Sequence, residues 1–439
     1  MKSINKIKSS TPHWVAFLFV LMLTGACSNQ KQPIVNPADY STYLESLPMP
    51  EYDIDVDIKF WHERLTKMPN DYASQVKLAG LHSALFRRTG DVRQIHYSDS
   101  IYLSLLESPS TDKAKIHLAL AQNAITQHQF KKAWSFTQAA LDEGELKPAS
   151  LMVMVDVKLE LGDLQGAKNI LRQFTNKNSF AHRIRQVKVK DQQGELDSAI
   201  YIMEQAFDRV KGNKDLFCWS LSNLGDMYGH AGRIEDAYRA YLNVLKKEPN
   251  YDYALKGIAW IALSHDKNLN EAKRIIAALA ARSRMPEAHL MLTEIAELEN
   301  DKHEKSNQLA AFVRMTDTPT YHTMYAKYLA NIFAEDLNQP EKSLAIAESE
   351  IANRPTPQSY DLKAWALLHL GREKEALVIA QNHVVEKTFE PEAAYHLGMI
   401  YKANGFEKEA EKYLEHALES SFELGPSVTH DIQKALKTR

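Results

Sequence analysis

The clearest hydrophobic pattern in the chain lies in residues 221–249. Leu221, Leu224 and Tyr228 recur at spacings of three and four, which is the period of one apolar helix face. Gly232 then interrupts the pattern, and a second apolar period follows it. The stretch therefore predicts two amphipathic helices joined by a tight turn.

The second of these helices carries Ala237, Tyr241 and Leu245 on its apolar side and ends before Pro249. Small residues mark the closest approach of the two helices, Gly225 in the first and Ala237 in the second. Larger side chains at these positions would push the two backbones apart. Two amphipathic helices within about 34 residues resemble the tetratricopeptide repeat (TPR) family.

Other parts of the chain repeat this pattern with varying fidelity. The regular copies begin after Thr111 and pair Leu120 with Ala133, Gly162 with Ala167, Gly194 with Ala199, and Ile258 with Ala272. Two clean copies close the series: Ala364, Gly371 and Ala376 in one, and Leu397, Gly398, Tyr401, Gly405, Ala410 and Leu414 in the other. The resemblance implies an all-α fold, a right-handed superhelical solenoid of stacked TPR-like helix pairs.

The repeat pattern also divides the chain into segments. In order, these are a lipoprotein signal peptide (1–26), a lipidated cysteine with a polar tether (27–52), degenerate N-terminal helix pairs (53–111), a TPR array (112–285), irregular TPR-like pairs (286–355), C-terminal TPRs (356–425) and a capping helix (426–439). The irregular pairs keep the helical period but lose the glycine of the turn. Irregular repeats of this kind are where TPR arrays often self-associate, so the segment 286–355 leaves homo-oligomerisation open.

The N-terminal segment carries a targeting pattern. Lys2, Lys6 and Lys8 precede an apolar run from Trp14 to Leu23, which small residues follow. This is the layout of a secretory signal peptide, and the apolar run is short for a bilayer span. Without residues 1–26 the formal net charge falls from −3 to about −6, because that segment holds three lysines and no acidic residue.

The residues around Cys27 resemble the processing site of bacterial lipoproteins, where the cysteine thiol carries the lipid and becomes the mature N-terminus. Leu23 lies four residues before Cys27 instead of the usual three. In that family an aspartate after the cysteine retains the protein in the inner membrane, and Ser28 and Asn29 stand there instead. The resemblance implies a lipid anchor in the outer membrane of a Gram-negative bacterium, facing the periplasm. An ordinary cleaved signal peptide with an incidental cysteine is the alternative.

Composition agrees with a helical protein that does not bind nucleic acid. Glycine and proline are scarce, at 16 each in 439 residues. A mildly acidic chain without a basic stripe is a poor candidate for nucleic-acid binding. If Cys27 is lipidated, Cys218 is the only thiol left and no intramolecular disulfide forms. A small buried hydrophobe is the favoured role for Cys218 over a reactive thiol.

No catalytic constellation is visible in the sequence. Phosphate-binding glycine loops, nucleophile elbows, zinc-binding helices and paired Cys-x-x-Cys motifs are all absent. Glu419-Ser420-Ser421-Phe422 resembles the Glu-Ser-x-Phe signature of lytic transglycosylases, but only 17 residues follow Phe422, too few for the catalytic domain. We therefore expect no enzyme, no cofactor and no metal.

In TPR proteins the first helix of each pair lines the concave surface and holds ligands. The resemblance assigns this role to one group of residues in each clean repeat: Trp219, Asp226 and His230; Tyr253, Lys256 and Trp260; Asp361, Trp365 and His369; and Tyr395, Met399 and Lys402. Their tryptophans and tyrosines offer large, stiff contact area for an extended peptide or a sugar ring. The alternative is that these aromatic rings only pack between neighbouring first helices.

Two functions fit this pattern. The first is a membrane-anchored scaffold that binds another envelope protein or peptide in the concave groove, without catalysis. The second is a glycan-binding or other ligand-binding lipoprotein partner of an outer-membrane transporter, which resembles the helical partners of nutrient-uptake systems. Those partners carry long aromatic-rich inserts, which this sequence lacks, so the scaffold is favoured.

Overall fold

The computed structural model describes residues 33–44, 53–108, 112–144, 146–282 and 285–438. The chain divides into two units, Met1–Gln32 and Pro33–Arg439, and only the second contains described residues. The expected signal peptide and the lipidation site at Cys27 therefore lie outside the described residues, and both stay predictions.

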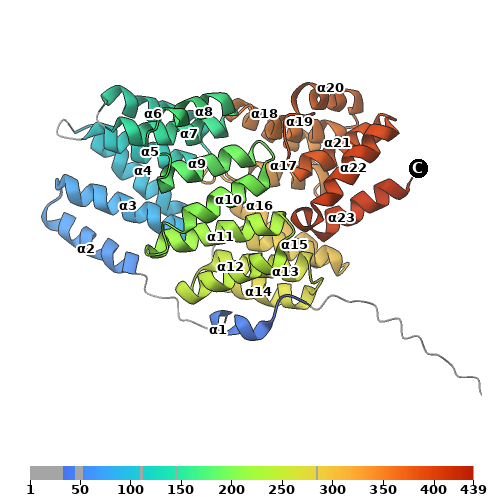
Figure 1. Ribbon diagram of the computed structural model, residues 1–439, viewed down its shortest axis with the longest axis horizontal. Coiled ribbons are helices and arrows are strands. Elements are labelled where there is room, and N and C mark those ends of the chain that lie inside the picture. The colour runs from blue at the N-terminus through green and yellow to red at the C-terminus, as the bar shows by residue number, and fades with distance from the viewer. Residues whose placement is uncertain (1–32, 45–52, 109–111, 145, 283–284, 439) are drawn as a thin grey trace, which may run out of the picture. The chain divides into compact units, whose positions relative to one another are not determined.

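The described residues form helices and no strand, arranged as ten consecutive pairs (Figure 1). The first helices of the pairs are α3 (Tyr72–Thr89), α5 (Lys113–Thr126), α7 (Lys147–Glu160), α9 (Phe180–Asp191), α11 (Lys214–His230), α13 (Asp252–Ser264), α15 (Glu287–Leu298), α17 (Ala326–Glu335), α19 (Pro357–His369) and α21 (Pro391–Ala403). The second helices are α4 (Val92–Leu106), α6 (Phe130–Glu143), α8 (Leu164–Arg172), α10 (Leu196–Phe207), α12 (Ile234–Lys247), α14 (Leu269–Arg282), α16 (Lys302–Thr316), α18 (Pro340–Asn353), α20 (Glu373–His383) and α22 (Glu407–Glu419).

Four further elements flank the pairs: η1 (Pro37–Asp39), α1 (Ser41–Leu44), α2 (Asp53–Lys67) and α23 (Ser421–Lys437). Each first helix packs on its own second helix, and most second helices pack on the first helix of the next pair, so the predicted all-α array of stacked TPR-like helix pairs is confirmed. The stability of such an array comes from the stacked interfaces, because no single pair buries a core of its own.

Tyr241 explains why the pattern at 221–249 needs glycine. Its ring lies between α11 and α13, and a Cβ built on Gly225 would come within 2.6 Å of it. A Cβ on Gly257 of α13 would meet the same ring from the other side. Leu224 and Ala237 are each 1% exposed beside it. The small residues of this repeat therefore make room for one large aromatic wedge, whose fit between close-packed helices resists added volume.

The remaining repeat positions are packed in the same way. Ala376, Leu397, Tyr401 and Ala410 are buried in one cluster, and a Cβ on Gly398 would meet Leu414 at 2.6 Å. Tyr228 is only partly buried, and its hydroxyl donates to Glu204 at 2.8 Å. Pro249 is exposed just after the end of α12.

The irregular segment keeps its turns without glycine. In most of the regular pairs a glycine with a left-handed backbone joins the two helices, as at Gly232, where φ is +70°, and in the other two His128 and Lys267 hold this position. In the two irregular pairs Asn300 and Asn338 take this place, with φ of +58° and +50°. Asparagine tolerates the left-handed region better than most residues because its short amide can hydrogen-bond locally. The lost glycines therefore do not signal lost turns.

Pairs that lie six positions apart in the array contact each other. The His128 carbonyl oxygen accepts a hydrogen bond from the Thr323 hydroxyl at 2.8 Å, across 195 residues. Arg354 pairs with Glu160 at 3.4 Å, across 194 residues. A Cβ on Gly194 would lie 2.7 Å from the ring of Phe389, at the same separation. The turn of one pair thus repeatedly meets the residues just before the first helix six pairs later.

Residues 33–44, which the sequence assigns to a polar tether, pack onto the array. The Ile34 and Val35 amides donate to the carboxylate of Asp266 at 3.0 and 2.8 Å. Tyr40 is fully buried, and its hydroxyl bonds to Glu271 of α14. The chain therefore enters the array along α12 and α14, held by polar contacts that hydrophobic periodicity does not register.

Candidate functional site

The candidate site is the surface formed by the first helices α11, α13, α15, α17, α19 and α21, which we call the first-helix surface. The sequence-predicted contact residues all lie on four of these helices. Helix α23 packs against α11, α13, α15 and α21, which are all first helices, as well as on α22 before it (Figure 1). The surface is therefore partly covered by the chain itself, and the predicted residues fall into an open group, a covered group, a buried group and a group that supports α23.

The open group is centred on Asp226 of α11. Its two carboxylate oxygens accept hydrogen bonds from Tyr241 at 2.6 Å and Tyr253 at 2.7 Å. Burial and this carboxylate both raise the pKa of the two tyrosines, so their hydroxyls stay protonated as donors. The Lys256 ammonium lies 4.5 Å from the centre of the Tyr253 ring. The Tyr253 side chain is thus held at its hydroxyl by Asp226 and contacted over its ring by Lys256.

Two aromatic rings of this group face solvent. Tyr253 is 39% exposed, and Trp219 at the start of α11 is 37% exposed. Trp219 has an edge-to-face contact with Phe180 of α9, with ring centroids 6.1 Å apart. Because these partly exposed rings are already fixed, little side-chain entropy is lost when a partner covers them.

The covered group is Trp260 and His230. The indole N–H of Trp260 donates to the Phe422 carbonyl oxygen at 3.0 Å, and Nδ1 of His230 lies 3.5 Å from the carboxylate of Glu423. Both partners belong to the first turn of α23. These two predicted residues therefore contact the C-terminal helix of the same chain.

The buried group lies in α19 and α21. Asp361 and Trp365 are 5% and 3% exposed. His396 lies 2.7 Å from the Asp361 carboxylate, and its ring stacks on Trp365 with centroids 4.0 Å apart. Burial alone would lower the pKa of His396, but the Asp361 carboxylate and its acidic neighbours raise it. Asp361 and Trp365 form a polar core between first helices, as the packing alternative anticipates.

Glu335 at the end of α17 extends this polar core towards solvent. It accepts a hydrogen bond from the Trp365 indole at 2.7 Å. Surrounding protein raises the pKa of Glu335 to about 7, although solvent reaches the side chain. His369 is exposed and meets the edge of the Trp365 ring at 4.7 Å.

The last predicted group supports α23. Tyr395 is 8% exposed, and Met399 is partly buried in the cluster that α23 also joins. Lys402 donates to the carbonyl oxygens of Ala435 and Thr438 at the end of α23. A cation there satisfies the last carbonyl groups of the helix and complements its dipole. Lys402 is therefore a helix cap in this structure.

The sequence did not single out α17, which supplies a further part of the open surface. Tyr328 is 44% exposed, and its ring lies beside that of Tyr325, with centroids 6.3 Å apart. Beside it, Lys327 and Asn331 both donate to the carboxylate of Glu392 on α21. The signal was available as helical periodicity, but the segment lacked the repeat glycine that guided the alignment.

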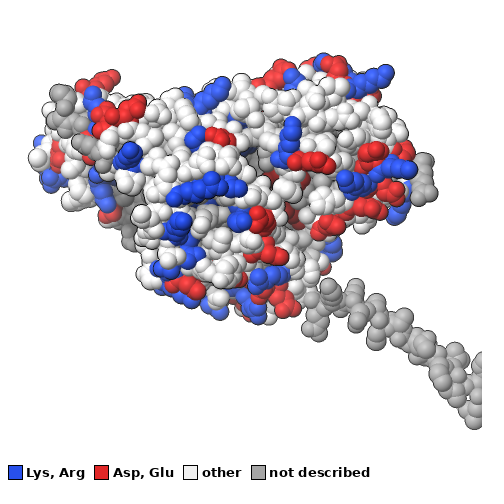
Figure 2. All heavy atoms as spheres, turned by 45° about the horizontal axis from the view of Figure 1, so that its top comes forward, with Lys and Arg blue, Asp and Glu red and all other residues white. Residues whose placement is uncertain are grey.

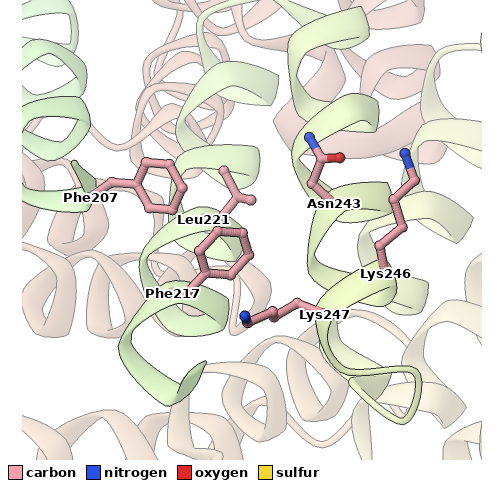
Figure 3. Close-up of a pocket in the computed structure, with 6 residues that line it drawn as sticks. All are labelled: Phe207, Phe217, Leu221, Asn243, Lys246 and Lys247. Carbon is pink, nitrogen blue, oxygen red and sulfur yellow. The ribbon is translucent and has the colours of Figure 1, made fainter. Parts of the chain in front are cut away.

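A separate cleft lies where α10, α11 and α12 meet, with a volume of about 460 Å³ (Figure 3). It is lined by Phe207, Phe217, Leu221, Asn243, Lys246 and Lys247. None of these residues belongs to the predicted contact set. Cys218, next to Phe217, is buried with a free thiol, and burial raises its pKa to about 11.

Charged side chains of both signs are interspersed over the face seen in Figure 2. Among the described residues, no three His, Cys, Asp or Glu side chains are arranged to hold a metal ion. Nor does this part of the chain contain a helix with the length and apolar character needed to cross a bilayer.

Comparison with known proteins identifies one repeat directly. Residues 391–423, which hold α21 and α22, match the family model described as tetratricopeptide repeat. No curated protein sequence matches the chain.

Three solved structures are similar in part. One is described as "Functional Characterization of Pseudomonas Aeruginosa pilF" (11% identity, 49% of this chain and 98% of that chain, TM-score 0.36). The others are a tetratricopeptide repeat protein from Parabacteroides merdae (12%, 68% and 99%, 0.35) and yeast Tom70 (12%, 82% and 95%, 0.33). The fold assignment rests on the helix pairs themselves.

Proposed function

We propose that this protein is a lipid-anchored adaptor of a Gram-negative cell envelope, which holds a segment of another protein on the open part of its first-helix surface. TPR proteins bind protein partners, and the fold alone suggests a scaffold. The observation that carries the proposal is the exposure of three aromatic rings on first helices, those of Trp219, Tyr253 and Tyr328. These rings are 37–44% exposed, and the Tyr253 hydroxyl is fixed by Asp226.

The chemistry of this surface suits a peptide backbone. Asp226, Glu287 and Glu392 place carboxylates on three first helices, and a carboxylate oxygen can accept a further bond besides the one it already has. The Lys256 ammonium lies beside the Tyr253 ring. An extended segment places alternating donors and side chains along such a row. Aromatic anchors flanked by polar groups are the usual composition of a protein-binding hot spot.

A sugar ring also stacks on tyrosine and tryptophan, so the glycan-binding lipoprotein stays the alternative. Within the ten pairs the connections between helices are short, and the longest runs from Thr316 to Ala326. In the part of the chain that the structure describes, no insert surrounds the rings, which favours a peptide over a sugar.

The membrane anchor is the part of the proposal that rests on sequence alone. The docking of Ile34–Tyr40 on α12 and α14 supports it in one respect, because a lipid on Cys27 would then be joined to the array through a firmly held segment. Labelling cells with a radioactive fatty acid tests the anchor: the unaltered chain should take up label, and a Cys27→Ala chain that still labels would contradict the processing site.

Co-purification from detergent-solubilised membranes tests the partner. Trp260 and Trp365 are unsuitable for mutation here, because one holds α23 and the other lies in a buried core. Trp219→Ala with Tyr253→Ala should remove a stoichiometric protein partner, whereas Tyr201→Ala, at a 63% exposed position on α10, should keep it. Recovery of an oligosaccharide and no protein would favour the alternative.

A further inference from the structure

The cleft between α10, α11 and α12 lies at the ends of two second helices that differ in length. Helix α10 has 12 residues and ends at Phe207, whereas α12 has 14 and ends at Lys247. The last turn of α12 therefore lacks a full neighbour on the α10 side. The chain turns away from Phe207 to begin α11 at Lys214, which leaves the recess open to solvent.

The floor of this cleft is apolar. The rings of Phe207 and Phe217 are tilted 54° to each other with centroids 5.2 Å apart, and both are only partly buried. Leu221, which is 8% exposed, lines the cleft beside them. Figure 3 shows the two rings on one side of the cleft, opposite the side chains of α12. Burying such rings under a partner's apolar side chain is favourable at about 25 cal/mol per Å² of apolar surface.

The rim of the cleft is basic. Lys246 and Lys247 are exposed, and neither forms an ion pair with a carboxylate of the described residues. Lys247 extends towards the Phe217 ring, with its ammonium 5.9 Å from the ring centre (Figure 3). Lys211 lies 5.4 Å from the centre of the Phe207 ring. The whole chain has a formal net charge of −3, so this concentration of cations is local.

Two acidic residues nearby do not neutralise the rim. Glu248 is 7% exposed and is already engaged by Arg88 at 3.2 Å and by Lys214. Asp208 pairs with Lys211 at 2.7 Å. Lys246 and Lys247 thus remain available to carboxylates from outside the chain.

We propose that this cleft is a second docking surface, which binds an acidic segment of a partner protein by taking one of its large apolar side chains between Phe207, Phe217 and Leu221. Carboxylates on either side of that side chain pair with Lys246 and Lys247. The rings line a recess and do not protrude, so they receive a side chain more readily than they insert into a bilayer. The cleft uses Phe217 and Leu221, which lie on the side of α11 opposite to Trp219 and Asp226, and it does not depend on the adaptor proposal or on a lipid at Cys27.

A labelled peptide tests this site on the full-length chain in detergent. The probe is dansyl-Asp-Glu-Leu-Trp-Glu-Asp-amide, and its neutral counterpart has each acid replaced by the matching amide. Fluorescence anisotropy should show about tenfold tighter binding of the acidic peptide, the effect of two partly exposed charge pairs. Equal binding of the two peptides would overturn the charge complementarity.

Two variants change the cleft in different ways. Lys246→Glu with Lys247→Glu reverses the charge of the rim. Asn243→Trp, at an exposed position on α12, fills the cleft and keeps both lysines. Each should weaken the acidic peptide about tenfold or more. The control Lys113→Glu with Lys115→Glu makes the same charge change at exposed positions at the start of α5 and should bind as the unaltered chain does. Circular dichroism confirms that each variant is folded.

Binding within twofold across all variants would overturn the proposal. So would a lysine-dependent binding of the chain to vesicles of 70% phosphatidylcholine and 30% phosphatidylglycerol with no binding of the peptide, because the basic rim would then contact lipid. If co-purification finds no partner that depends on Trp219 and Tyr253, the adaptor proposal fails, but the acidic peptide should still bind in the cleft.

Discussion

The indole N–H of Trp260 donates to the carbonyl oxygen of Phe422 at 3.0 Å and joins positions 162 residues apart in the chain. A Cβ on Gly425 would lie 2.9 Å from the same indole, and the Ser427 amide donates to Glu294 of α15 at 2.9 Å. The start of α23 is therefore fastened across the ends of three first helices. A C-terminal segment that the sequence presents as a simple cap holds distant parts of the array together.

Trp260→Phe should weaken the attachment of the start of α23 to α13 while an aromatic ring still fills the space beside Gly425. The substitution keeps an aromatic ring beside Gly425 but removes the donor to Phe422, which should cost about 1 kcal/mol. Hydrogen exchange of the amides at 421–432 should become faster. Trp219→Phe is the control, because the Trp219 indole donates no hydrogen bond to any of the described residues, and equal acceleration in both would contradict the role of the bond.

Gly225→Ala should destabilise the array although alanine is the better helix former. A Cβ at this position meets the Tyr241 ring at 2.6 Å, and overpacking of this kind costs about 1–3 kcal/mol. Gly80→Ala in α3 is the matched control, because its Cβ would only reach the Tyr102 hydroxyl at 3.6 Å. We expect Gly80→Ala to stabilise by about 0.5–1 kcal/mol in urea unfolding. A change in the free energy of unfolding in the same direction for both variants would contradict the role of Tyr241 as a wedge.

Asn353→Ala should show that pairs six positions apart stabilise each other. The Asn353 amide donates to the His128 carbonyl oxygen at 2.7 Å, and its oxygen accepts from the Phe130 amide at 3.1 Å. Loss of both should cost about 1–3 kcal/mol, since partly buried backbone groups are left unpaired. The control Asn223→Ala removes only a bond within α11 and should stay within about 0.5 kcal/mol of the unaltered chain in urea unfolding. Similar losses in both would argue against a stabilising contact between distant pairs.

Glu335→Gln should flatten the dependence of stability on pH. The folded-state pKa of Glu335 is about 7, above its ordinary value of 4.5, because surrounding protein disfavours the charge. The folded chain thus keeps a proton that the unfolded chain releases, so stability falls as the pH rises from about 4.5 to about 7. Glutamine still accepts from the Trp365 indole and carries no charge in either state.

Urea unfolding at pH 5 and pH 8 measures this difference. The Glu335→Gln chain should lose less stability between the two values than the unaltered chain. The raised pKa of His396 acts in the same direction and persists in the variant, so a smaller decline remains. Glu415→Gln, at an exposed position on α22, is the control. An unchanged decline in Glu335→Gln would contradict the assigned pKa.

Much of the fold follows from local pattern. The period of three and four around Leu224 and Ala237 specifies helix pairs, and the left-handed turn at Gly232 specifies where they join. Such features depend only on neighbouring residues. The turns at Asn300 and Asn338 are also local, but asparagine is a weaker signal than glycine for a left-handed turn, so the sequence did not mark them.

The candidate site could be predicted from the sequence less completely than the fold, because it depends on contacts across the whole array. Repeat alignment located Trp219, Asp226 and Tyr253 on one surface. It did not reveal that Trp260 is held by α23 or that Lys402 caps that helix, since these contacts join residues far apart or in a non-repeating segment. The docked Tyr40 was missed for the same reason, and Tyr328 because its repeat lacks the usual glycine.

Photo-cross-linking in native membranes tests the central claim most directly. A benzoylphenylalanine placed at Tyr253 or at Tyr328 of the full-length chain should cross-link to one and the same protein, identified by mass spectrometry. The adduct should disappear when Trp219 is also changed to alanine, and it should be absent when the probe stands at the exposed Tyr201 of α10. No protein adduct from either first-helix position, or the same adduct from Tyr201, would contradict the adaptor function.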